Sequence, residues 1–202
     1  MVEEHERLAT PAGSRRPEHR PRAAILACSD ARVPPSLIFG QEPGALFVVR
    51  LAGNSATAGA VASLTYAVEA LETRLVVVLG HTDCGAVNAA LATDQRGTAV
   101  LRPILSPIDE VLDGCADCTD PDTAVITNVR RNLARLRNDR GPLGEAIRLG
   151  SIELRGAVHD LGTGHLTDVT DAPTGASTAD ADAPHPNRTE PNQPLTRSTT
   201  TP

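Results

Sequence analysis

Residues 75–85 decide the fold, and they read LVVVLGHTDCG. The first five residues are apolar and rich in β-branched valine, which is typical of a strand that is buried on both faces of a parallel sheet. The sequence then turns polar at His81 and reaches a glycine, where we expect a helix to begin. A strand that leads directly into a helix is the repeating unit of an α/β fold.

Similar apolar runs recur along the chain and alternate with segments of helical periodicity. The predicted strands are 23–27, 46–49, 75–79 and 152–158. The predicted helices are 55–73, 85–92, 104–112 and 122–137, with Asn54 or Ser55 as the N-cap of the first and Pro103 or Pro107 at the start of the third. The pattern predicts an α/β fold, with a mainly parallel sheet of about four to five strands flanked by helices on both faces.

The chain has 202 residues, 40% hydrophobic and 22% charged, which suits one globular domain of ordinary size. We expect this domain to cover residues 23–170. Residues 1–22 contain three prolines and no sustained apolar periodicity, so they predict a short, poorly ordered N-terminal arm. Residues 171–202 have Leu195 as their only large aliphatic residue and predict a disordered tail, because they bury too little surface to offset the entropy of ordering.

The composition excludes several classes of function. All 19 basic residues are arginine, so a P-loop lysine or a Schiff-base lysine is ruled out. The net charge is −6, and no stretch interleaves arginines with aromatic residues, which argues against nucleic acid as a partner. The run 75–79 is too short to cross a membrane, and residues 1–8 are charged where a signal peptide needs apolar residues. We therefore expect no membrane partner and a cytoplasmic location.

Two of the predicted strands end in polar clusters that can meet. Cys28, Asp30 and Arg32 follow the first strand, and His81 and Cys84 follow the third. Ligand sites gather at the carboxyl ends of parallel strands, so the clusters share one region if these strands are neighbours. Zinc favours thiolate and imidazole, and a catalytic zinc has three protein ligands with one position open. Cys28, His81 and Cys84 make up such a set.

Other interpretations of these residues remain. Cys115 and Cys118 form a C-x-x-C pair that can bind a metal or cycle as a redox couple, and all the cysteines together could form an all-cysteine zinc site. We favour two incidental loop cysteines, because an all-cysteine site would leave His81 and Asp30 without a role. Asp30 and Arg32, taken alone, could be a surface ion pair in a solvated turn.

The two clusters resemble the two-part signature of the β-class carbonic anhydrases. Residues 28–32, CSDAR, match its Cys-x-Asp-x-Arg block, and residues 81–85, HTDCG, match its His-x-x-Cys block. The likeness extends over residues 23–169 and includes EPG at 42–44 and FVVR at 47–50. The family's fold is expected to cover most of the chain.

The resemblance implies a zinc lyase, a carbonic anhydrase with one Zn²⁺ per chain. Such an enzyme hydrates carbon dioxide reversibly to bicarbonate and a proton by means of zinc-bound hydroxide. The resemblance implies that Cys28, His81 and Cys84 hold the zinc. Asp30 would orient the hydroxide or ligate the zinc in a resting state, and Arg32 would keep Asp30 ionised and oriented.

The resemblance also implies a substrate pocket and an assembly. Phe47 and Tyr66 match positions that line a narrow apolar pocket at a dimer interface, and Gly85 matches a position beside the substrate, so a homodimer or higher homo-oligomer is expected. His19 stands where many members have a bicarbonate-binding glutamine, and we interpret it as an exposed linker residue. Two alternatives stay open: hydrolysis of carbon disulfide or carbonyl sulfide at the same zinc, and a non-catalytic zinc-binding protein with a degenerate dimer arm.

Overall fold

The structure is a computed structural model that describes residues 18–92, 99–113, 115 and 118–170. The predicted C-terminal tail and most of the predicted N-terminal arm lie outside these residues. Across the described residues, no helix combines the length and apolar character needed to cross a membrane.

A five-stranded sheet forms the centre of the described domain, in the order β2-β1-β3-β4-β5. The strands are β1 (Ala23–Ala27), β2 (Leu46–Arg50), β3 (Leu75–His81), β4 (Glu153–His159) and β5 (Leu166–Asp168). The first four run parallel, and β5 pairs antiparallel with β4. All four predicted strands are confirmed. The sequence does not predict β5 because its three residues are exposed and form no apolar run.

Strands β1 and β3 are neighbours in the sheet, and the predicted site depends on this, because the polar clusters that follow the two strands can meet only if the strands lie side by side. The two strands pair in register, with Ala27 opposite Leu79. Their carboxyl ends therefore open on the same edge of the sheet, and the polar residues that follow them are brought together.

Short helices connect the strands. They are α2 (Pro35–Ile38), the 3₁₀ turn η1 (Ala52–Asn54), α3 (Ala58–Glu69), α4 (Gly85–Leu91), α5 (Arg102–Leu112), α6 (Pro121–Arg137) and α7 (Pro142–Arg148). The four predicted helices are present, with Pro103 near the start of α5. The sequence misses α2 and α7, since helices this short show little periodicity. The predicted cap of α3 is wrong: Asn54 belongs to η1, and the side chain of Thr57 accepts the hydrogen bond from Ala60 N.

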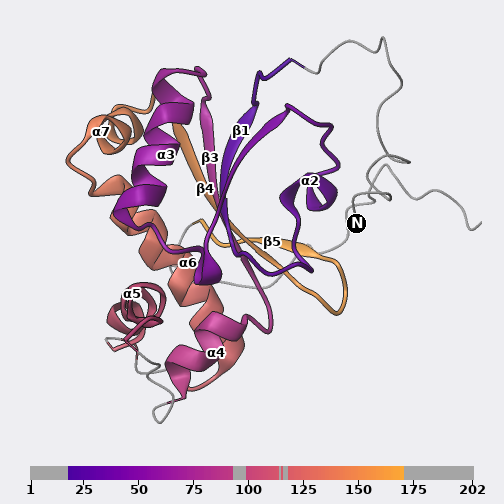
Figure 1. Cartoon of the computed structure of the whole chain (residues 1–202), viewed down its shortest axis with the longest axis vertical. Coiled ribbons are helices and arrows are strands. Elements are labelled where there is room, and N and C mark those ends of the chain that lie inside the picture. Colours follow the sequence, from indigo (N-terminus) through magenta and orange to yellow (C-terminus); the bar gives the residue numbers. More distant parts are fainter. Residues whose placement is uncertain (1–17, 93–98, 114, 116–117, 171–202) are drawn as a thin grey trace, which may run out of the picture. The chain divides into compact units, whose positions relative to one another are not determined.

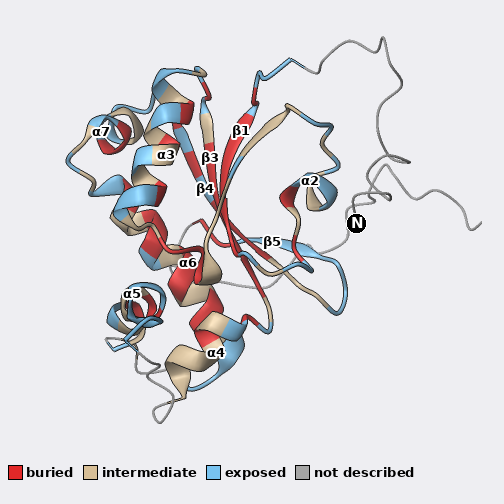
Figure 2. Cartoon of the chain, in the orientation of Figure 1, coloured by how far each residue is buried: buried red, intermediate tan, exposed pale blue. Residues whose placement is uncertain are grey.

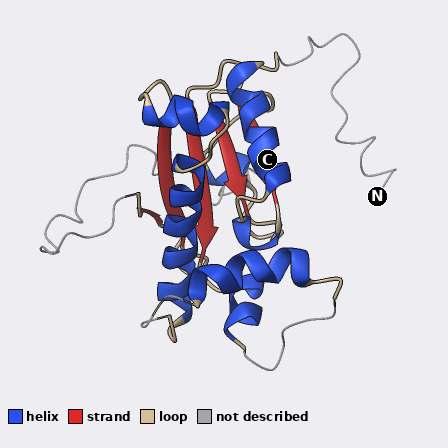
Figure 3. Ribbon diagram, turned by 90° about the vertical axis from the view of Figure 1, so that its left-hand side faces the viewer, coloured by secondary structure: helices blue, strands red, loops and turns tan. Residues whose placement is uncertain are grey.

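Helices cover the two faces of the sheet unequally. Helix α6 packs on β3 and β4, α3 packs on β1 and β2, and the remaining longer helices pack against these two. Figure 1 shows α3, α5, α6 and α7 on one side of the sheet, α2 on the other and α4 below the lower end of the strands, and in Figure 3 the helices lie in front of the strands. Helices are predicted on both faces, and among the described residues only α2 lies on the second face, where Ile38 and the following Phe39 pack against a buried cluster that includes Ile25 and Leu79.

Two glycines let α6 approach the sheet closely. A Cβ atom at Gly80 of β3 would lie 2.6 Å from Val129 Cγ2, and one at Gly156 of β4 would lie 2.7 Å from Leu133 Cδ1. Both distances are too short for carbon atoms, so glycine is required at these positions. Figure 2 shows that β1, β3 and the inner sides of the helices are largely buried, whereas β5 is exposed. Helix α6 is thus tightly packed next to the carboxyl edge of β3.

The N-cap of α6 gives a pH-dependent contribution to stability. Asp120 accepts hydrogen bonds from Thr123 N and Thr123 Oγ1, both at 2.8 Å. The bond from the backbone N–H, followed by the hydroxyl bond, lowers the pKa of Asp120 in the folded chain. Its stabilising contribution is therefore present above the unfolded pKa, about 4, and is lost as the pH falls through the folded pKa.

We expect Asp120→Ala to lower the melting temperature at neutral pH, and the difference from the wild type to shrink as the pH falls below about 4. Asp120→Asn is the matched control, because its amide oxygen still caps the helix but carries no charge. Thermal unfolding followed by circular dichroism between neutral and acidic pH measures both variants. A deficit in Asp120→Ala that stayed constant with pH would contradict this account of the cap.

Candidate metal centre

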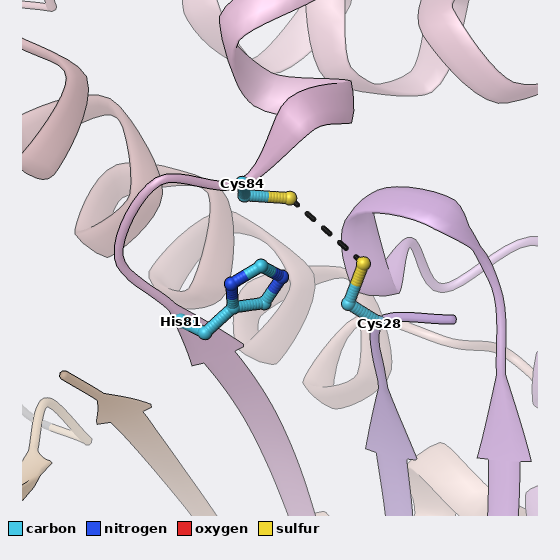
Figure 4. A group of neighbouring side chains, drawn as sticks. All are labelled: Cys28, His81 and Cys84. Carbon is cyan, nitrogen blue, oxygen red and sulfur yellow. Dashed lines mark hydrogen bonds between the residues drawn. The ribbon is translucent and has the colours of Figure 1, made fainter. Parts of the chain in front are cut away.

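The two polar clusters meet at the carboxyl edge of the sheet. Cys28 directly follows β1, His81 is the last residue of β3, and Cys84 precedes the first residue of α4. All three side chains are buried, and their potential ligand atoms lie within 4.8 Å of one another. Figure 4 shows the imidazole lying beside the two sulfur atoms, which face each other. The arrangement could hold a metal ion.

The imidazole of His81 is oriented for this task. Its Nδ1 lies 2.8 Å from the carbonyl oxygen of Thr82, to which it can donate. Its Nε2 is buried and has no hydrogen-bond partner. A proton on Nδ1 leaves Nε2 with a free lone pair next to two thiols, and a buried polar atom without a partner is costly. A metal ion would satisfy it, so the residues present fit a cation.

The two thiols share their protons unequally. Cys28 Sγ and Cys84 Sγ lie 3.9 Å apart. The hydrogen bond from Cys84 lowers the pKa of Cys28, and the same contact raises the pKa of Cys84. One of the two sulfurs therefore donates its proton in a hydrogen bond to the other across this contact. A divalent cation that displaces this proton would bind both cysteines as thiolates.

Arg32 joins the loops on the two sides of the cluster. Its Nε and Nη2 donate to the two carboxylate oxygens of Asp30 at 3.0 and 2.7 Å. Its Nη1 donates to Asp83 Oδ2 at 3.0 Å, and Nη2 also donates to the Asp83 carbonyl oxygen at 3.1 Å. Asp83 stands between the ligand candidates His81 and Cys84, so one guanidinium ties the first block to the second. This geometry goes beyond a surface ion pair in a single turn.

The same contacts keep Asp30 ionised beside the cluster. The side-chain hydrogen bonds from Arg32 hold the pKa of Asp30 well below its usual range. Asp30 Oδ2 lies 4.0 Å from His81 Nε2. A carboxylate that is charged at neutral pH is therefore fixed next to the nitrogen that faces the thiols.

The contacts of two further residues near the cluster are not predicted from the sequence. Arg50, at the end of β2, donates from Nε to the Cys28 carbonyl oxygen at 2.9 Å and from Nη2 to the Asp30 carbonyl oxygen. Asp83 accepts from Arg32 and also from Asn88 Nδ2 at 3.3 Å. The sequence carries a signal for Asp83, since an acidic residue between two ligand candidates is placed to contact the site. Arg50 belongs to the FVVR segment of the resemblance, but its contact with the Cys28 backbone depends on the pairing of β2 with β1.

The predicted pocket residues lie in different places. Gly85 is the first residue of α4, directly after Cys84, and a Cβ there would meet nothing within 4 Å. Phe47 and Tyr66 form an aromatic pair with ring centroids 6.1 Å apart, and Phe47 also stacks on the exposed His19. Phe47 lies opposite Ala24, toward the far end of β1 from Cys28. Within one chain, the aromatic pair is thus separated from the cluster of Cys28, His81 and Cys84.

The remaining cysteines form a separate feature. Cys115 and Cys118 are joined by a disulfide bond, whereas Cys28 and Cys84 are free. The alternative of an all-cysteine metal site is therefore wrong. The interpretation of two incidental loop cysteines stays a prediction as to their role, with the added finding that the two sulfurs are bonded to each other.

Comparison with known proteins agrees with this geometry. The family model for carbonic anhydrase matches residues 23–166. The chain is 37% identical over 150 residues to carbonic anhydrase 2 of Mycobacterium tuberculosis, which covers 72% of each protein. It is 35% identical over 170 residues to the carbonic anhydrase of Pseudomonas aeruginosa, covering 78% of this chain and 75% of the relative.

Solved structures show the same fold. A tetrameric β-carbonic anhydrase from Sordaria macrospora aligns with a TM-score of 0.66 and 29% identity, over 80% of this chain and 84% of that one. The Coccomyxa β-carbonic anhydrase in complex with acetazolamide aligns with a TM-score of 0.68 and 28% identity, over 78% and 73% of the two chains. Together with the Cys-His-Cys cluster, these matches show that the chain is an enzyme of the β-class carbonic anhydrase family.

Proposed function

We propose that the chain binds one zinc ion through Cys28, His81 and Cys84 and catalyses the reversible hydration of carbon dioxide to bicarbonate and a proton. The observation that carries the proposal is the buried cluster of three ligand atoms within 4.8 Å, with an unpartnered imidazole nitrogen facing two thiols. Thiolate and imidazole are preferred zinc ligands, and three protein ligands leave a fourth position for catalysis.

When bound, zinc would supply a Lewis acid that activates water near neutral pH. Asp30 would then act on this water through its carboxylate. Because its carboxylate is ionised, it accepts hydrogen bonds and cannot donate them. A water molecule that donates to Asp30 keeps its lone pairs free to attack the carbon of a small, neutral substrate.

Arg32 acts on the reaction through Asp30. Its two parallel hydrogen bonds fix the plane of the carboxylate, and its charge keeps the carboxylate ionised. Its further bonds to Asp83 hold the guanidinium in place. Because the Asp30 carboxylate is already held in position, no free energy is needed to reorient it during the reaction.

We further propose that the chain assembles with copies of itself. The aligned Sordaria enzymes are described as tetrameric. Tyr66 is 54% exposed and Val48 is 39% exposed in the single chain, so apolar surface on α3 and β2 is open to a second copy. A cytoplasmic location stays a prediction.

The proposed ligands predict which cysteines are needed for zinc binding and for carbon dioxide hydration. Stopped-flow carbon dioxide hydration should be measured on protein whose zinc content is known. We expect one zinc per chain and fast hydration in the wild type, and loss of both in Cys84→Ser. The double variant Cys115→Ser/Cys118→Ser is the control and should keep its zinc, because its cysteines lie outside the cluster.

Three outcomes would contradict the proposal. Zinc loss in the control variant would mean that the ligands are wrongly assigned. Full zinc without carbon dioxide hydration, but with hydrolysis of carbon disulfide or carbonyl sulfide, would mean that the substrate is wrong. Full zinc with none of these activities would mean a non-catalytic zinc-binding protein.

The contacts of Arg32 predict a loss of turnover without a loss of metal. We expect Arg32→Ala to keep near-normal zinc content and to lower kcat on the order of tenfold to a thousandfold, the range for losing a preorganised electrostatic partner. Arg155→Ala is the matched control, because Arg155 is an exposed arginine that pairs with Glu153 and Asp168 instead. An Arg32→Ala enzyme with full zinc and undiminished kcat would refute the role of the Asp30–Arg32 pair.

A further inference from the structure

Two asparagines on α6 are almost completely buried. Asn128 is 1% exposed and Asn132 is 0% exposed. Burying an amide is costly unless its polar atoms find partners, and asparagine is not a strong helix former. The metal-ligand assignment gives neither residue a role, although both lie on the helix that packs against β3.

The amide of Asn128 points at the turn that follows β2. Its Nδ2 donates to the carbonyl oxygen of Gly53 at 2.9 Å, across 75 positions of the sequence. Asn132 fixes its orientation, because Asn132 Nδ2 donates to Asn128 Oδ1 at 3.1 Å and to the Asn128 carbonyl oxygen at 2.8 Å. Asn132 Oδ1 in turn accepts from Ala56 N at 2.7 Å. The turn is thus held at two points by α6.

Gly53 links Asn128 and Asn132 to the candidate metal centre. Its backbone N–H donates to Cys28 Sγ at 3.5 Å. Gly53 has a φ of +73°, and a Cβ atom there would collide with Ile108 Cδ1 of α5. This position therefore requires glycine, and the Asn128 amide bonds to the carbonyl oxygen of the same residue.

Helix α6 is a rigid base for this contact. The close approach of α6 to β3 and β4 at Gly80 and Gly156 leaves it little freedom to shift. Because β3 also ends in His81, the same packing that places the imidazole places the Asn128 amide.

We propose that Asn128, oriented by Asn132, is a positioning residue that holds the Gly53 N–H on the sulfur of Cys28 and thereby strengthens metal binding by that sulfur. The inference rests on the proposed function, since it takes Cys28 as a metal ligand. A hydrogen bond to a ligand atom orients it and tunes its donor strength, and removing such a partner typically lowers metal affinity about 10- to 100-fold.

The test uses the full chain, stripped of metal and loaded with Co²⁺ or Zn²⁺ alone. Asn128→Ala removes the donor to Gly53 O. We expect it to shift the thiolate-to-cobalt charge-transfer absorption and to weaken zinc binding about 10- to 100-fold in competition with a chelator. Thr73→Val is the matched control: Thr73 is also buried, but its hydroxyl bonds to Pro21 O at the opposite end of β3. Thr73→Val should lower the melting temperature and leave the spectrum and the affinity unchanged.

A wild-type cobalt spectrum and zinc affinity in Asn128→Ala would overturn the inference and leave the proposed function intact. A wild-type chain that bound neither metal would overturn both. If Asn128→Ala does not fold, Asn132→Ala replaces it, because it keeps the Asn128 side chain but removes the bond that orients its amide, together with the bond from Ala56 N. In Asn132→Ala we expect a smaller shift of the thiolate-to-cobalt absorption in the same direction. An unchanged spectrum and zinc affinity in this variant would overturn the inference.

Discussion

The guanidinium of Arg32 connects the two segments that carry the potential metal ligands. On one side it pairs with Asp30, two residues after Cys28, and on the other it bonds to Asp83, between His81 and Cys84. The parallel pairing of β1 and β3 brings these segments to one edge, but it does not fix the loops that follow the strands. Arg32 does this with charged hydrogen bonds, which are stronger than neutral ones. The same bonds keep Asp30 ionised, so one side chain serves both the geometry and the electrostatics of the centre.

Contacts from β2 and α6 support the backbone around the candidate metal centre. Arg50 bonds to the carbonyl oxygens of Cys28 and Asp30 from β2, and Asn128 bonds to the Gly53 turn from α6. Both contacts join different elements of the fold, and both end on backbone carbonyl oxygens. A buried, charge-bearing cluster needs such support, because a loop that moved by an ångström would no longer offer three ligand atoms to one ion.

The sequence predicts the sheet and the candidate ligands well because their signals are local. The apolar runs mark β1 and β3, and Cys28, His81 and Cys84 follow them at positions where parallel strands gather ligands. The supporting contacts of Arg50 and Asn128 could not be predicted, since each depends on which elements become neighbours in space. The sequence indicates the bond between Cys115 and Cys118 only as one form of a redox couple, because a spacing of three residues permits a disulfide but does not require one. Helix α7 and strand β5 are too short to show a period.

The central claim is that Cys28, His81 and Cys84 together hold one zinc ion. Zinc-edge X-ray absorption on the purified full chain tests this most directly, because it counts the sulfur and nitrogen neighbours of the metal without relying on activity. The account predicts a four-coordinate zinc with two sulfur ligands and one imidazole, and loss of one sulfur or of the whole signal in Cys28→Ser. A zinc surrounded by four sulfurs, or by oxygen and nitrogen alone, would contradict it.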